Sequence, residues 1–309
     1  MHILGIIAGI LLIGTSCHDV FHTLFHPAGR GALSDRLSRW IWRGVRAVAK
    51  RRGDMITLGG PIIFLAIVST WALLIIFGFA LIYWANLDVF AAVPGMDPSR
   101  PKTFFDAFNV SLGALITIAG DYNSNSKLMR LLMGAQAVIG FGLLTAAVSW
   151  LLSVYPVLEQ RRSLAHRSTL LHAAEERAAV SVFDFPCSEL SALLLAITEE
   201  VTTLRNSMSQ FPVSYYFHGG ENETALPGIL EYIRGIGERA THSHDASVRI
   251  TGTMLSGAII DYLELLAMVY LRMPSDDIPA VLRAYARDQL RDVVEYEPRP
   301  IKDRDSRVA

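Results

Sequence analysis

The sequence predicts an all-α membrane protein with three transmembrane helices and one re-entrant helix, followed by a cytoplasmic helical domain. Three observations lead to this prediction. Hydrophobic residues make up 51% of the 309 residues, and the mean hydropathy of +0.34 is high for a soluble protein. Several stretches without charge are long enough to cross a bilayer core, which takes roughly 20 helical residues. The charge is also unevenly divided: residues 1–158 carry 12 Lys and Arg against 7 Asp and Glu, and residues 159–309 carry 16 against 22.

Residues 1–27 contain the first expected transmembrane helix. Only His2 interrupts the apolar run up to Cys17, and His18 and Asp19 are expected near the inner end of the helix. A secretory signal peptide is an alternative, but it needs a basic start and a small-residue cleavage site, and neither is clear. The sequence Gly14-Thr15-Ser16-Cys17 also has a weak likeness to a lipoprotein cleavage site.

Residues 28–54 are predicted to form a basic amphipathic helix on the cytoplasmic membrane surface. Eight basic residues lie between Arg30 and Arg52, with Asp35 as the single acid. Such a pattern favours binding to anionic headgroups, and the positive charge places this segment in the cytoplasm and the N-terminus outside. The residues expected to face lipid are Arg43, Arg46, Lys50, Arg51 and Arg52. A solvated basic helix with no role in lipid binding is the alternative.

Residues 55–158 are predicted to form one membrane domain. Residues 61–87 have no charge and form the second expected span, and the proline-rich residues 88–102 form an extracellular loop. The 28 residues 131–158 also carry no charge and form the third span. Between these spans, the 13 residues from Phe104 to Ile116 are too few to cross a bilayer. A short apolar segment before a full span is typical of a re-entrant loop, whose irregular backbone must be buried in protein or line water.

The same stretch resembles a known family. The sequence from Asp106 to Asp121, the polar residues 122–126 and the Gly-Phe-Gly-Leu-Leu of the third span resemble the pore helix, filter, extracellular turn and inner helix of potassium-channel-like ion channels. The resemblance covers roughly residues 55–158. It implies that four copies assemble around a ring of backbone carbonyls that replaces the hydration shell of a permeant cation, with K⁺ as the default ion.

The resemblance assigns a selectivity filter to the five residues Thr117, Ile118, Ala119, Gly120 and Asp121. The family pattern Thr-Val-Gly-Tyr-Gly-Asp has two glycines and a tyrosine, whereas this chain has one glycine and no aromatic residue in the filter. The filter can be aligned with the family pattern either at Asp121 or at Thr117. In both alignments, one of the two glycines and the tyrosine of the pattern are missing from this chain. A weakly selective cation pore therefore remains open beside a potassium pore, with Asp121 at the outer mouth.

Residues on either side of the filter have expected structural roles. Thr103 is expected to cap the pore helix, with Asp106 in the first turn opposing the helix dipole favourably. Gly140 lies where the family carries a hinge glycine, and Gly142 is next to it, so both are candidates for a gating hinge. Close helix packing through small residues is the alternative for the same positions.

Three histidines could form a metal site or a proton sensor. His18, His22 and His26 recur every four residues and therefore share one helix face. A polar helix end that faces headgroups is the more ordinary interpretation, so no metal is assigned. The two cysteines, Cys17 and Cys187, lie in different segments and imply no disulfide.

Residues 159–297 are predicted to form a cytoplasmic helical domain that could bind a cytosolic regulator. Residues 188–208 have a helical apolar period, and residues 248–273 form a buried core helix because Asp261 and Glu264 disfavour a span. Ser275 is expected to cap a last helix that ends near Glu295. Residues 298–309 are predicted to be disordered.

These features favour an integral cation channel of the plasma membrane, assembled as a homotetramer. Catalytic motifs such as Gly-x-Ser-x-Gly and His-Glu-x-x-His are absent from the sequence, so no enzyme and no cofactor is expected. The acidic C-terminal part argues against nucleic acid as its partner. The alternatives are a non-conducting membrane sensor or scaffold with a degenerate pore loop and a partner-binding cytoplasmic domain, and an oligomeric transporter.

Overall fold

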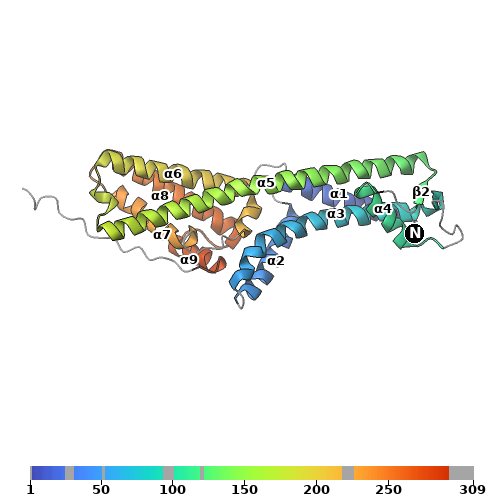
Figure 1. The fold of residues 1–309 in the computed structure, drawn as a ribbon, viewed down its shortest axis with the longest axis horizontal. Helices are drawn as coiled ribbons and strands as arrows, with labels where there is room; N and C mark the ends of the chain where they lie inside the picture. The colour runs from blue at the N-terminus through green and yellow to red at the C-terminus, as the bar shows by residue number, and fades with distance from the viewer. Residues whose placement is uncertain are drawn as a thin grey trace, which may run out of the picture. The chain divides into compact units, whose positions relative to one another are not determined.

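The computed structural model describes residues 2–24, 31–50, 53–92, 101–118, 122–217 and 226–291, and nearly all of them are helical (Figure 1). The α-helices are α1 (His2–Leu24), α2 (Ala32–Ala49), α3 (Gly59–Ala85), α4 (Phe104–Leu115), α5 (Lys127–Ala178), α6 (Cys187–Gln210), α7 (Leu226–Thr241), α8 (Ala246–Leu265) and α9 (Ile278–Asp288). A π-helix (Leu266–Leu271) extends α8, and short 3₁₀-helices span Gly53–Leu58, Leu87–Val89, Val182–Asp184 and Pro212–Tyr216.

The chain divides into two compact units. The first contains Met1–Ile41 and Pro61–Ser153, and the second contains Trp42–Gly60 and Val154–Ala309. The helices α2 and α5 each contribute to both units. Because α5 continues without interruption through Pro156 to Ala178, the predicted domain boundary after residue 158 falls inside a helix.

Four helical segments have the length and apolar composition to cross a membrane: His2–Leu24, Met55–Ala85, Lys127–Ala178 and Ala246–Leu271. Three of them correspond to the predicted spans. The fourth is α8 with its π-helical extension, which packs against α6 and α7 in the second unit and buries Leu255, Ile259 and Leu263. Because length and composition would also let this helix cross a membrane, the expected core helix at residues 248–273 stays a prediction.

In the first unit, α1 and α3 run antiparallel in a close pair. His2 Nδ1 lies 2.8 Å from the Ala85 carbonyl oxygen at one end, and the Ser16 hydroxyl donates to the Trp71 carbonyl at 3.1 Å further along. Between them, a Cβ placed on Gly9 would lie 2.4 Å from the Gly78 carbonyl oxygen. Small residues therefore allow the two backbones to approach, as in many packed membrane helices.

The helical content bears out the predicted all-α class, and the structure adds one short antiparallel pair of strands, β1 (Phe90–Ala92) and β2 (Tyr122–Ser124). Two details of the last helix differ from the prediction. The last described helix is capped by Asp277, whose carboxylate accepts from the Ala280 N–H at 2.9 Å, and not by Ser275. Because proline fits the first turn of a helix, Pro279 sets the start of α9 at this later position. The helix ends at Asp288, before Glu295, and residues 298–309 lie outside the described residues.

Candidate functional site

The short helix α4 begins where the sequence predicts. The Asp106 carboxylate accepts hydrogen bonds from the Thr103 N–H at 2.7 Å and from the Thr103 hydroxyl at 2.9 Å. Asp106 is only 4% exposed, and it lies in the first turn, where a negative charge interacts favourably with the helix dipole. The expected capping pair is therefore confirmed. At 12 residues, α4 is about 18 Å long, well short of a bilayer core of about 30 Å.

A buried polar network holds α4 between α3 and α5. The Tyr83 hydroxyl donates to Gln136 Oε1 at 2.9 Å, and Gln136 Nε2 donates to the Ser111 carbonyl at 2.9 Å and to the Ser111 hydroxyl at 2.8 Å. The Ser111 hydroxyl in turn donates to the Ile76 carbonyl at 2.8 Å. Gln136 and Ser111 are fully buried. Sequence analysis missed this network, although Gln136 is a polar residue inside an otherwise apolar run.

The C-terminal end of α4 turns sharply at the first predicted filter residue. Thr117 has φ = 60°, the Ile118 N–H donates to the Gly113 carbonyl at 2.9 Å, and the Thr117 N–H donates to the Ala114 carbonyl at 3.4 Å. This pattern is a Schellman motif, in which the left-handed position is usually glycine. A β-branched residue is strained there. Ala119, Gly120 and Asp121 lie outside the described residues.

The strands β1 and β2 lie before and after α4 in the chain and pair with each other. Phe90 pairs with Ser124 and Ala92 with Tyr122, and the Asn125 N–H donates to the Val89 carbonyl at 3.0 Å. The chain therefore leaves this point, forms α4 and its turn, and returns to the same point before α5 begins (Figure 1).

The two hinge candidates on α5 have different surroundings. A Cβ on Gly140 would lie 2.1 Å from the Leu115 carbonyl oxygen, so this glycine lets the last residue of α4 contact the α5 backbone. A Cβ on Gly142 would meet no atom within 4 Å. The helix is continuous through both residues. The structure thus gives Gly140 the packing role that was the alternative to a hinge.

The predicted lipid-facing basic residues differ in their surroundings. Arg43 and Lys50 are exposed, whereas Arg46 forms an ion pair with Asp288 at 2.6 Å. Arg51 and Arg52 lie outside the described residues. The charge of Arg46 is therefore compensated within the protein, and lipid contact by the whole set stays a prediction.

Two of the three predicted histidines lie side by side on α1. The His18 and His22 rings are in contact, with centroids 4.3 Å apart, and His26 lies outside the described residues. Among the residues that the structure describes, no group of three or more His, Cys, Asp and Glu could hold a metal ion.

Asp19 is 3% exposed and lies at the N-terminus of α2. Its carboxylate accepts from the Leu33 N–H at 2.9 Å, the Ser34 N–H at 3.2 Å and the Trp71 indole N–H at 2.9 Å, and from the Ser34 hydroxyl. It therefore satisfies N–H groups that the first turn of a helix leaves without intrahelical partners. Sequence analysis placed Asp19 at the inner end of α1 but did not assign it this role.

A partly buried aspartate, Asp288, connects several elements of the second unit. Asp288 Oδ2 accepts from the Trp42 indole N–H at 2.8 Å and from the Tyr215 hydroxyl at 2.6 Å, while Oδ1 pairs with Arg46. Burial raises the pKa of Tyr215 well above its usual value, and the negative charge of Asp288 raises it further. These contacts fix the C-terminal half of α2 to α9 and to the Pro212–Tyr216 turn.

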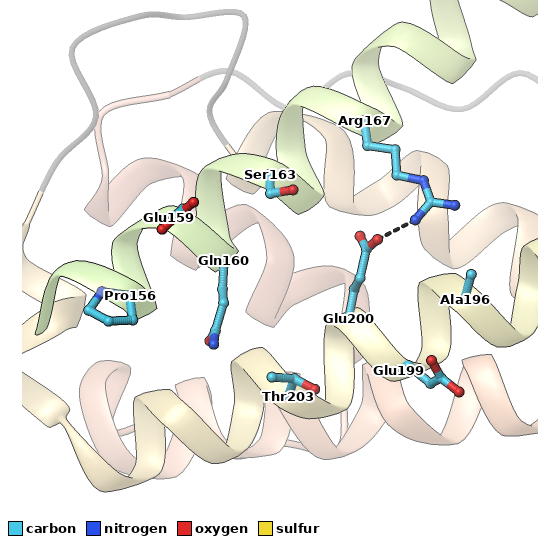
Figure 2. Close-up of a pocket in the computed structure, with 9 residues that line it drawn as sticks. All are labelled: Pro156, Glu159, Gln160, Ser163, Arg167, Ala196, Glu199, Glu200 and Thr203. Carbon is cyan, nitrogen blue, oxygen red and sulfur yellow. Dashed lines mark hydrogen bonds and ion pairs between the residues drawn. The ribbon is translucent and has the colours of Figure 1, made fainter. Parts of the chain in front are cut away.

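The second unit also has a groove between α5 and α6 with a volume of about 520 Å³ (Figure 2). The residues that line it are Pro156, Glu159, Gln160, Ser163, Arg167, Ala196, Glu199, Glu200 and Thr203. Arg167 and Glu200 form an ion pair across it. The remaining charges, Glu159 and Glu199, are acidic, so the groove favours a cationic or neutral occupant.

Comparison with known proteins gives one informative relative. The chain is 26% identical over 223 residues to the uncharacterised membrane protein YdjJ of Bacillus subtilis strain 168, and the match covers 71% of this chain. It spans 64% of the relative's length. No family model matches, and no solved structure matches. The name of this relative and the four long apolar helices both indicate a membrane location. The chain is a membrane protein.

Proposed function

We propose that the chain is one subunit of an oligomeric cation-conducting pore in the plasma membrane, with α4 as a re-entrant helix followed by the selectivity filter predicted at residues 117–121. A single such loop provides only part of a ring, so several copies must meet around an axis. The homotetramer and K⁺ as the permeant ion come from the resemblance to potassium-channel-like proteins. The second unit is then cytoplasmic and available to a regulator.

The observation that carries this proposal is the pairing of β1 with β2. Because these strands flank α4, both ends of the α4 segment lie at the same point, next to the C-terminal end of α3 and the N-terminal end of α5. A 12-residue helix that departs from and returns to one end of two longer apolar helices has the geometry of a re-entrant loop.

The polar contacts of α4 support the same proposal. The network of Tyr83, Gln136 and Ser111 satisfies polar groups that lipid could not satisfy. The carbonyl end of α4 carries the negative end of the helix dipole, which favours a nearby cation.

Ion flux in liposomes tests the proposal. Purified protein reconstituted in vesicles should carry K⁺ or Na⁺ down a gradient, but not Cl⁻, and cross-linking should give a discrete oligomer. Empty vesicles and vesicles with heat-denatured protein are the controls. A monodisperse, folded protein that moves no cation over a range of voltage and pH would count against conduction.

The second candidate is a non-conducting membrane sensor or scaffold whose second unit binds a partner. Two observations favour it: Thr117 already closes α4 in a left-handed turn, and the filter sequence has one glycine where the family has two. The same reconstitution separates the two candidates, since a sensor forms the oligomer without flux.

A further inference from the structure

One side of α2 is exposed and basic. Exposed residues here are Arg36, Trp40, Arg43 and Ala47 of α2, and Lys50, which directly follows α2 and donates its N–H to the Arg46 carbonyl. Trp40 keeps 76% of its surface accessible. At 100° per residue, these five positions fall within about 60–80° of the helix circumference. We call these five residues the basic face of α2. It contains three cations, one large aromatic side chain and no acid.

The opposite side of α2 is fixed to the rest of the protein. Ser34 is held by Asp19 in the first unit, and Trp42 is held by Asp288 in the second. Arg39 forms an ion pair with Asp35, and Arg46 forms one with Asp288. These contacts fix the rotation of α2 about its own axis, so the basic face stays directed outward.

The neighbours of α2 are the ends of apolar helices. Its first turn binds Asp19, in the last two turns of α1. Further along, the Trp42 ring packs on Gly59, the first residue of α3. A Cβ placed on Gly59 would lie only 2.7 Å from a carbon of the Trp42 ring. Since α1 and α3 are long enough to span a bilayer, we expect both contacts to lie near the headgroups.

We propose that the basic face of α2 binds the anionic lipid headgroups of the bilayer in which the protein resides. Lys and Arg side chains near a bilayer surface are attracted by anionic lipids, and tryptophan favours the interface because it combines an apolar ring with one N–H donor. The face lacks the run of apolar residues that a second protein chain would bury. This inference rests on the membrane location of the chain and does not require that the protein conducts ions.

The depth of a spin label on α2 tests this binding. A nitroxide is attached at A47C in a C17S/C187S background, and the protein is reconstituted in phosphatidylcholine vesicles with or without phosphatidylglycerol. The label should be protected from a water-soluble nickel relaxant in the anionic vesicles, and 1 M salt should reduce that protection. In detergent, the number of phosphatidylglycerol molecules retained is counted by native mass spectrometry.

In the variant R36Q/R43Q/K50Q, protection of the label from the relaxant should no longer depend on anionic lipid. The apparent affinity for phosphatidylglycerol should fall roughly fivefold for each charge removed. The matched control R177Q/R283Q/R287Q removes three exposed charges elsewhere in the second unit and should bind as wild type. Equal relaxant access in both vesicle types would overturn the proposal. So would protection that rises with protein concentration in neutral vesicles, because it would identify a second copy as the occupant.

Discussion

Two glycines two residues apart on α5 have opposite tolerances for a side chain. We expect Gly140→Ala to destabilise the protein by about 1–3 kcal/mol, because the new Cβ would overlap the Leu115 carbonyl oxygen and push α4 away from α5. Gly142→Ala should be neutral or stabilising by up to about 1 kcal/mol, because its Cβ meets open space and alanine favours the helix. Thermal unfolding in detergent measures both. Equal damage by the two variants would instead indicate a hinge that needs both glycines.

Tyr215 links the stability of the second unit to alkaline pH. Burial and the charge of Asp288 raise the pKa of Tyr215 in the folded protein. Below about pH 10 the hydroxyl is neutral in the folded and unfolded states, and above it the unfolded chain releases the proton first. Stability therefore falls as pH rises past 10, by up to about 1.4 kcal/mol per pH unit for this one group.

The variant Tyr215→Phe separates the hydrogen bond from the ionisation. At pH 7 it should cost about 1–3 kcal/mol, because the bond to the Asp288 carboxylate is lost. Above pH 10 the difference in the free energy of unfolding between wild type and variant should become smaller, because only the wild type loses stability through ionisation of Tyr215. Denaturant unfolding between pH 7 and 11 gives both values, with Tyr155→Phe, an exposed tyrosine, as the control. A gap that stays constant with pH would contradict the raised pKa.

At the scale of elements, the position of α4 depends on one glutamine. Gln136→Leu keeps the side-chain size but leaves the Tyr83 hydroxyl without its acceptor and removes both bonds to Ser111. We expect a loss of about 1–3 kcal/mol in the free energy of unfolding. Thr145→Ala is the control on the same helix, because its hydroxyl bonds only to the Phe141 carbonyl one turn earlier.

A double-mutant cycle with Tyr83→Phe checks that the network acts as a unit. If Tyr83 and Gln136 share one hydrogen bond, the two substitutions should cost less together than the sum of their separate effects. Unfolding in mixed micelles of increasing SDS measures each variant. Additive costs would show that the two side chains do not depend on each other.

The sequence predicted those elements whose signals are local. The apolar runs of α1, α3 and α5 are visible in composition alone, and the cap of α4 is visible because Thr103 and Asp106 are three residues apart. The cap of α9 was placed two residues too early, because Ser275 and Asp277 are both good caps and only the position of Pro279 selects between them. The pairing of β1 with β2 was missed because each strand has only three residues.

At the scale of the whole molecule, the contacts that define the site join residues far apart in the chain. Gln136 is 53 residues from Tyr83, and Trp42 is 246 residues from Asp288. Neither pairing follows from periodicity or spacing. The ion pair of Arg46 was also hidden in the sequence, because only the fold brings Asp288 to Arg46.

The two units are connected through α2 and α5, each of which is a continuous helix that contributes to both.

The central claim is that α4 enters and leaves the membrane on one side, and cysteine labelling tests it most directly. Pro101 precedes α4 and Asn125 follows its turn, and both are exposed. In a C17S/C187S background, P101C and N125C are labelled in sealed vesicles of known orientation with a maleimide that cannot cross the membrane. We expect both cysteines to react from the same side. Reaction from opposite sides would show that this segment crosses the bilayer, and would contradict the account.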